Sequence, residues 1–195
     1  QRMPGDPWEE ETERGATAGP LRYQPGTFLQ AGELTVGGVR ATWLGSGEAE
    51  GEGNDVFAYP GRPWVIRVKR QSGISQDQQA AEFESFARLA QLGIGPRPVV
   101  SGLANGHPYL IVERIEGESL GRILETRPLT EGEVALVMEL VTLLLKARGY
   151  LMDFTPGNIM IGRLGNSDRK AFVSDAEYLR WEPALTVQEL AGRYQ

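Results

Sequence analysis

The feature that most limits the possible folds is the spacing of three polar side chains in the last quarter of the chain. Asp153 is followed five residues later by Asn158, and Asp175 comes seventeen residues after Asn158. The apolar runs 159–161 and 172–173 lie between them and predict the two strands of a hairpin. One carboxylate of such a set can orient or deprotonate an attacking hydroxyl group, while the amide and the second carboxylate can hold Mg²⁺ on nucleotide phosphates. A turn capped by Asp or Asn explains any one of these residues, but it does not explain the spacing of the set.

The composition narrows the classes of protein to consider. A chain of 195 residues with 41% apolar residues can form one domain, or one domain of two small lobes. The net charge of −6 argues against a nucleic-acid partner, because neutralising phosphates requires a basic face. The lack of cysteine and the single histidine, His107, exclude thiolate and histidine metal clusters. The longest apolar block, 134–145, contains Glu139 and is too short for a membrane span, so we expect no membrane partner.

The first part of the chain reads as an arm followed by a strand-rich lobe. Residues 1–31 are rich in Pro, Gly, Glu and Thr, and we expect a linker or N-terminal arm. Residues 32–115 predict a small antiparallel sheet of five strands with one helix, the helix over residues 76–92. The turn 105–108 joins the last two strands, so His107 is expected to be an exposed turn residue and not a catalyst.

The second part of the chain reads as helical. Helices are predicted over residues 119–126 and 130–148, and Thr130 with Glu133 forms an expected capping box at the start of the second helix. We therefore expect an α+β, two-lobed fold in which residues 116–195 form a truncated helical C-lobe.

A glycine-rich segment could approach phosphates. Gly45, Ser46 and Gly47 open a turn between two predicted strands, where backbone N–H groups are not obstructed by Cβ atoms. Three glutamates within residues 48–52 should repel phosphate, so a plain glycine-rich hairpin is the alternative interpretation.

The strand that follows carries two cations on one face. Alternation over residues 65–69 places Arg67 and Lys69 together and the apolar residues on the other face. One of the two could contact the α- and β-phosphates. If it is Arg67, Val65 would cover the adenine; if it is Lys69, Arg67 takes that place. The residues do not decide between them, and two exposed strand cations are the alternative.

Two further positions complete the candidate nucleotide site. Glu82 could pair with the strand cation, and the apolar pattern that follows it favours Glu82 over its neighbour Glu84. A hinge expected over residues 113–117 would offer the backbone groups of Glu113 and Ile115 to an adenine edge.

From about Gly32 to Leu179 the chain resembles the protein kinase-like superfamily, because the glycine-rich loop, basic strand, helix glutamate, hinge, catalytic loop and metal-binding acid occur in that family's order. The segment from Asp153 to Asn158 is similar to the catalytic loop of phosphotransferase-type kinases. Asp175-Ala176-Glu177 looks like the Asp-Phe-Glu variant of choline-kinase-like enzymes. The resemblance implies a two-lobed minimal kinase-like fold with ATP and Mg²⁺ as cofactors. It gives roles to the base Asp153, to the metal ligands Asn158 and Asp175, and to the set of Lys69, Arg67 and Glu82.

Three departures separate the chain from ordinary kinases. Leu151 stands in place of a largely structural histidine, the glycine-rich loop has an acidic insertion, and only 20 residues follow Asp175. This leaves no room for an activation segment or for the helices that hold a peptide. It is similar to the minimal kinases that bacterial pathogens deliver as effectors or toxins. One such family phosphorylates a eukaryotic heat-shock chaperone, and the Gly-x-Gly followed by Asp55-Val56-Phe57 looks similar to it.

The function we expect is ATP- and Mg²⁺-dependent phosphorylation of a Ser or Thr hydroxyl on a folded protein, by a monomeric domain. An effector of this kind would be secreted from a bacterium and act in the host cytoplasm. A small-molecule kinase of the choline or aminoglycoside type is one alternative. A pseudokinase or nucleotide-binding interaction module is another, and transfer of AMP in place of phosphate also stays open.

Overall fold

The computed structural model describes residues 19–27, 30–46, 53–73, 76–152, 154–177, 179–186, 188–189 and 192. Within this part of the chain the backbone divides into two compact units. Unit 1 comprises the described residues up to 79 together with 99–112, and unit 2 comprises 80–98 and the described residues from 113 onward. Each unit is therefore built from segments that are separated in the sequence.

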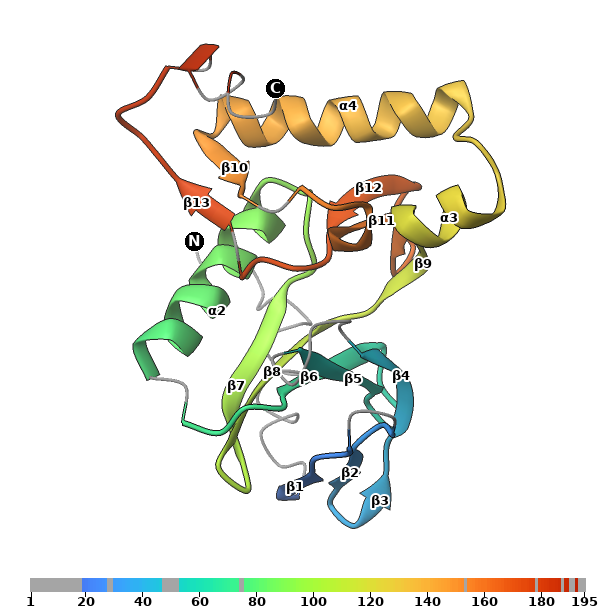
Figure 1. Cartoon of the computed structure of the whole chain (residues 1–195), viewed down its shortest axis with the longest axis vertical. Helices are drawn as coiled ribbons and strands as arrows, with labels where there is room; N and C mark the ends of the chain where they lie inside the picture. Colours follow the sequence, from blue (N-terminus) through green and yellow to red (C-terminus); the bar gives the residue numbers. More distant parts are fainter. Residues whose placement is uncertain are drawn as a thin grey trace, which may run out of the picture. The chain divides into compact units, whose positions relative to one another are not determined.

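Unit 1 contains a small antiparallel sheet in the order β1-β2-β3 (Figure 1). Its strands are β1 (Leu21–Gln24), β2 (Glu33–Val36) and β3 (Val39–Arg40). Gly37 and Gly38 form the turn between β2 and β3 with φ of 56° and 85°, which is a conformation that glycine adopts readily. β1 lies among the residues expected to form an arm. Its pairing with β2 buries Tyr23. The strand was not predicted, because it is only four residues long and the neighbours of Tyr23 in the sequence are polar.

The second sheet of unit 1 confirms the expected five strands, in the order β4-β5-β6-β8-β7. The strands are β4 (Thr42–Ser46), β5 (Asn54–Ala58), β6 (Trp64–Lys69), β7 (Pro98–Ala104) and β8 (His107–Glu113). The turn between β7 and β8 is tight, since Asn105 and Gly106 have φ of 53° and 83°. The residue types that accept positive φ, Asn and Gly, stand where this turn requires them.

The alternation predicted for β6 agrees with which of its residues enter the hydrophobic core. Trp64, Ile66 and Val68 belong to the hydrophobic core of unit 1, and Ile66 pairs in register with the buried Phe57 of β5. The odd-numbered residues of β6, both cations among them, therefore share the opposite face.

Unit 2 contains a three-stranded sheet, β12-β11-β9, and a separate antiparallel pair, β10-β13 (Figure 1). The strands are β9 (Ile115–Ser119), β10 (Gly149–Leu151), β11 (Ile159–Leu164), β12 (Lys170–Val173) and β13 (Leu179–Trp181). The last three residues of the segment 113–117, for which a hinge was expected, belong to β9, and the boundary between the units falls between Val112 and Glu113; the hinge itself stays a prediction. Gly117 pairs with Gly162 of β11, and a Cβ on Gly117 would lie 2.5 Å from the Gly162 Cα. Such a contact between distant glycines leaves no local signal of a strand.

The helices of the described residues follow the predicted pattern and confirm the α+β class. They are α2 (Gln76–Gln91), α3 (Leu120–Thr126), α4 (Glu131–Lys146) and the 3₁₀ turn η1 (Pro156–Asn158). The predicted capping box is confirmed: the Glu133 amide donates to Thr130 Oγ1 at 3.2 Å, and the Thr130 amide donates to the Glu133 carboxylate at 3.0 Å. Within the described residues no helix has the length and apolar character that crossing a membrane requires.

Glu133 also joins three segments of unit 2. Its side chain is buried, and its carboxylate accepts two hydrogen bonds from Arg127, both at 2.8 Å, and one from Arg169 at 2.8 Å. The Arg127 hydrogen bonds, helped by those from Thr130 and Arg169, hold the pKa of Glu133 well below its ordinary value. The α3–α4 connection is thereby fixed to the residues that lead into β12.

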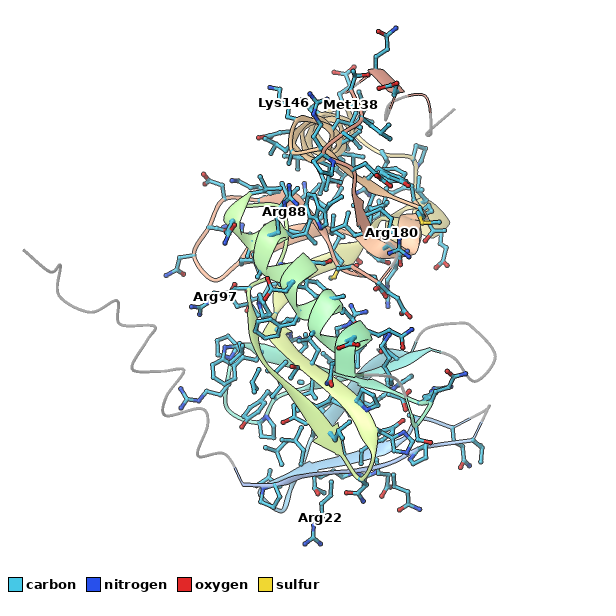
Figure 2. All side chains as sticks on the ribbon, turned by 90° about the vertical axis from the view of Figure 1, so that its left-hand side faces the viewer. Arg22, Arg88, Arg97, Met138, Lys146 and Arg180 are labelled. Carbon is cyan, nitrogen blue, oxygen red and sulfur yellow. The ribbon has the colours of Figure 1, made fainter. Side chains whose placement is uncertain are left out.

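Helix α4 has one buried side and one exposed side. Leu140 and Leu144 are buried, whereas Met138 is 59% exposed. Met138 and Lys146 are labelled in Figure 2 on the outer surface of α4. The helix thus contributes to the core of unit 2 through one face only.

Candidate functional site

The two residues expected to bind metal lie at one end of the β11–β12 hairpin. The register pairs Ile159 with Val173, so the next residues outward are Asn158 and Ser174. The Ser174 amide donates to the Asn158 carbonyl oxygen at 2.9 Å and extends the ladder by one step. Asp175 follows directly, so both candidate ligands leave the same end of a single hairpin.

Local hydrogen bonds restrict both candidate ligands. The backbone N–H of Asn158 donates to the Thr155 carbonyl oxygen at 3.0 Å in η1. Asp175 Oδ1 accepts a hydrogen bond from the Glu177 amide at 3.1 Å, which limits rotation of the carboxylate. Both side chains are half-buried. The Asp175 carboxylate is therefore oriented by a neighbouring amide, while Asn158 is fixed through its backbone.

The donor chemistry fits Mg²⁺ shared with a phosphate. Mg²⁺ prefers oxygen donors and is commonly held by one or two carboxylates together with phosphate oxygens and water. Asn158 supplies an amide oxygen, and Asp175 supplies a carboxylate. Among the described residues no group of three or more His, Cys, Asp or Glu side chains could hold a metal ion.

Asp153, the expected base, lies outside the described residues, but the strand that leads to it is described. Leu151, in β10, is buried and pairs with Leu179 of β13. The side chain that replaces the expected histidine therefore packs in unit 2.

The two strand cations of unit 1 are buried, so they are not ordinary exposed strand residues. Arg67 and Lys69 are 8% and 9% exposed, and they share a face of β6. The β5–β6 register places Lys69 opposite Asn54 and Arg67 opposite Val56. Asn54 is the first residue of β5, so Lys69 pairs with the end of β5 that leaves the glycine-rich loop.

The remaining residues of the expected phosphate loop are described in part. Gly45 and Ser46 lie in β4, whereas Gly47 lies outside the described residues. Among the described residues no atom would lie within 4 Å of a Cβ on Gly45, so their packing does not require glycine at this position. Val65 is half-buried and stands two residues before Arg67 on the same face of β6.

Glu82 and the expected hinge residues belong to unit 2. Glu82 is 8% exposed, whereas its rival Glu84 is exposed. The Glu113 amide donates to the Arg97 carbonyl oxygen at 3.0 Å, and the Glu113 carboxylate accepts from the Arg97 amide at 3.0 Å. The adenine contact expected of Glu113 would therefore fall to its carbonyl oxygen. Ile115 is buried at the start of β9.

The prediction that His107 is an exposed turn residue was wrong. His107 is half-buried at the start of β8, and its Nδ1 lies 3.1 Å from the Lys69 carbonyl oxygen. Its ring also packs edge-on against Tyr23 with the centroids 5.1 Å apart. The pairing of β8 with β6 turns the ring inward, which the sequence of the turn alone could not show.

Sequence reasoning missed Asp55, a fully buried carboxylate in β5. It accepts hydrogen bonds from the Tyr23 hydroxyl at 2.6 Å and from the Gly32 amide at 3.0 Å. Arg70 donates to it twice, from Nε at 3.0 Å and from Nη2 at 2.7 Å. A signal existed, because alternation in β5 puts Asp55 on the same face as the buried Phe57, where a charged residue requires partners.

A comparison with protein families now adds to this geometry. The family described as "APH: Phosphotransferase enzyme family" matches residues 49–147, about half of the chain. The match includes β5, β6, α2 and most of the expected nucleotide residues, and it ends before the pair of candidate metal ligands. The α+β architecture with antiparallel sheets fits a small kinase-like fold. No curated protein matches the chain.

Proposed function

Because the chain belongs to the phosphotransferase enzyme family, we propose that it transfers the γ-phosphoryl group of ATP, with Mg²⁺, to a hydroxyl group of a protein. The observation that carries the proposal is the β11–β12 register, which brings Asn158 and Asp175 to the same end of one hairpin. A structural turn needs only one such residue, whereas a phosphate-bound Mg²⁺ needs oxygen donors that lie together.

Each residue has a separate role in this reaction. Bound Mg²⁺ would offset the charge of the phosphates, and Asn158 and Asp175 would hold it. Asp153 would orient the acceptor hydroxyl and take its proton. The hydroxyl oxygen forms the new bond to the γ-phosphorus, the bond from that phosphorus to ADP breaks, and the proton goes to Asp153.

The strand register favours Lys69 over Arg67 as the phosphate-contacting cation. Lys69 pairs with Asn54, at the end of β5 that leaves the glycine-rich loop, whereas Arg67 pairs with Val56, two residues further along. An ammonium beside that loop can meet phosphate as a point charge. Arg67 then stands next to Val65 on the adenine side, and Glu82 is the acid proposed to hold the cation.

The acceptor we propose is a Ser or Thr hydroxyl on a folded protein. Among residues 176–186, the described ones form a three-residue strand, β13, and turns. They provide no helical wall around a small acceptor, so an acceptor with its own surface fits better. The resemblance to effector kinases makes a host chaperone the first candidate. A small-molecule hydroxyl is the second candidate class, supported by the family match.

The test compares the chain with two matched variants, Asp153→Asn and Asp175→Asn, which keep side-chain size and remove one charge each. Each protein is incubated with Mg²⁺, γ-labelled ATP and a eukaryotic lysate, and labelled species are identified by mass spectrometry. We expect labelled Ser or Thr in proteins with the unmodified chain only. Label from α-labelled ATP would indicate AMP transfer, label only in small molecules would favour the second acceptor class, and no nucleotide binding would refute the proposal.

A further inference from the structure

Asp55 is the centre of a set of hydrogen bonds in unit 1 that the proposed reaction does not explain. Its two oxygens accept hydrogen bonds from Tyr23, from Gly32 and twice from Arg70. The fit is tight, because a Cβ on Gly32 would lie 2.7 Å from Asp55 Oδ2 and 2.6 Å from the Tyr23 ring. Burial, followed by the hydrogen bond to Asp55, raises the pKa of Tyr23, so the hydroxyl stays a donor.

One partner of Asp55, Arg70, is the residue that follows Lys69 in the chain. The backbone N–H of Arg70 donates to the Gly53 carbonyl oxygen at 3.2 Å. The Arg70 guanidinium donates two hydrogen bonds to Asp55, from Nε and Nη2. On the other side of the strand, the Lys69 carbonyl oxygen lies 3.1 Å from His107 Nδ1. The backbone of Lys69 is therefore held from both neighbouring strands.

The same contacts fix the point where the glycine-rich loop returns to the sheet. Gly53 and Asp55 flank Asn54, the residue that pairs with Lys69. Tyr23 lies in β1, and Gly32 directly precedes β2. The β1–β3 sheet therefore supplies hydrogen-bond donors to Asp55. Asp55 thus links the loop end, the end of β6 and the small sheet.

We infer that Asp55 is a positioning residue for ATP: through Arg70 and Tyr23 it fixes the end of the glycine-rich loop and the backbone of Lys69 in the geometry that receives the phosphates. The inference rests on the proposed function and extends it to residues that touch no substrate. It gives the β1–β3 sheet a part in nucleotide binding.

We expect Asp55 to position other groups because its hydrogen bonds are directional, and not only because they stabilise unit 1. A buried ion pair can often be replaced by apolar side chains of similar volume at no cost in stability. Hydrogen bonds from a planar guanidinium to a carboxylate instead set distances and angles. A displacement of about 1 Å in a substrate-positioning group can cost about 100-fold in rate.

The experiment measures the Kd of Mg·ATP by calorimetry, together with KM and kcat, well below the melting temperature of each variant. Tyr23→Phe keeps the ring and removes the hydroxyl, Arg70→Met removes the guanidinium, and Asp55→Asn removes the charge. We expect Kd and KM for ATP to rise about tenfold for Arg70→Met and Asp55→Asn, and about threefold for Tyr23→Phe, with smaller changes in kcat.

The sign of the Asp55→Asn effect separates positioning from bulk electrostatics. Removing a negative charge near a phosphate site should tighten ATP binding if only charge matters. Loss of positioning should weaken it. Tighter binding by Asp55→Asn would overturn the inference, and if that variant does not fold, Tyr23→Phe, which changes no charge, decides in its place.

Two controls separate positioning from general destabilisation. Val99→Ala truncates a residue of β7 that packs against the core of unit 1, and Arg122→Met breaks the exposed ion pair with Glu118. Both should bind ATP like the unmodified chain, even when Val99→Ala melts as early as Arg70→Met. An ATP affinity that follows the melting temperature across all variants would overturn the inference. An unmodified chain that binds no ATP would refute the proposed function itself, whereas equal ATP affinity in all variants would refute only the role of Asp55.

Discussion

At the scale of single residues, the proposed reaction depends most on the two aspartates. Asp153→Ala and Asp175→Ala should each lower turnover by about 100-fold or more, because one removes the proton acceptor and the other a metal ligand. Only Asp175→Ala should weaken the Mg²⁺-dependent part of ATP binding. Calorimetry with and without Mg²⁺, beside initial rates, measures both effects. Turnover like that of the unmodified chain in both variants would end the proposal.

The two buried cations of β6 should be unequal. Lys69→Ala should impair ATP use strongly, since loss of a charge-assisted contact costs about 1.5–3 kcal/mol, or roughly 10- to 100-fold in affinity. Arg67→Ala should be the milder of the two, because its partner in the register is Val56. Rates at varied ATP give KM and kcat for each variant. The reverse order would assign the phosphate contact to Arg67.

Glu133 should make the stability of the chain depend on acid pH. Its pKa is lowered in the folded state by Arg127, Thr130 and Arg169, so its contribution is complete above the unfolded value near 4.5 and is lost as pH falls toward the folded pKa. Glu133→Gln should therefore be less stable than the unmodified chain at pH 7, with a gap that narrows below pH 4.5. Urea unfolding at several pH values measures the gap. Glu131→Gln, at an exposed position of the same helix, is the control and should show no such narrowing.

The sequence predicted residues whose role depends on local spacing and failed for residues whose role depends on distant strands. Asn158 and Asp175 could be found because they flank one hairpin. Asp55 and His107 were missed because their partners Tyr23 and Lys69 lie more than thirty positions away in the chain, although alternation in β5 already indicated that Asp55 is buried. The roles of the site residues themselves stay predictions.

At the scale of elements, the β9–β11 pair depends on two glycines. Gly117→Ala and Gly162→Ala should each destabilise unit 2, because their Cβ atoms would lie 2.1 Å from the Ile161 carbonyl oxygen and 2.5 Å from the Glu116 carbonyl oxygen. Thermal unfolding measures the effect. Gly132→Ala is the matched control, since its Cβ would meet only Thr130 Oγ1 at 4.0 Å, and alanine favours a helix by about 1 kcal/mol. Equal melting temperatures for all three variants would contradict this packing.

Helices and strands whose apolar residues recur with a clear period were predicted from the sequence. Strands that form only because a distant strand pairs with them were not. α4 and the β11–β12 hairpin showed apolar periods of 3.6 and 2 together with capping and turn residues. β9 has the sequence Ile-Glu-Gly-Glu-Ser, which has little intrinsic preference for a strand. It becomes one because β11 lies beside it, and no local rule contains that information.

At the scale of the whole molecule, the chain should be active without prior phosphorylation. Backbone hydrogen bonds already fix residues 179–182 after Asp175: β13 pairs with β10, and the Glu182 amide donates to the Arg148 carbonyl oxygen at 2.8 Å. No added phosphate is needed to order them. Phosphatase-treated protein should keep its full rate on the identified target. A strict requirement for phosphorylation of the chain would contradict this.

The acceptor should be recognised as a folded surface. With only β13 and turns in the described part of residues 176–186, the chain should use a folded target at least tenfold better in kcat/KM than a short peptide from the same site. Initial rates on both substrates at equal ATP measure the ratio. Faster turnover of the peptide would favour a groove for extended chains.

The β11–β12 hairpin has an evolutionary consequence. Asn158 and Asp175 stand at the two ends of one continuous stretch of chain, and their spacing is set by a ladder within that stretch. Hairpins form in about 1–10 μs, and this one keeps the pair within about twenty residues of chain. A gene that shortens, duplicates or exchanges other segments can therefore pass this pair on intact. The proposed metal site can then persist in descendants whose acceptors and lengths have diverged.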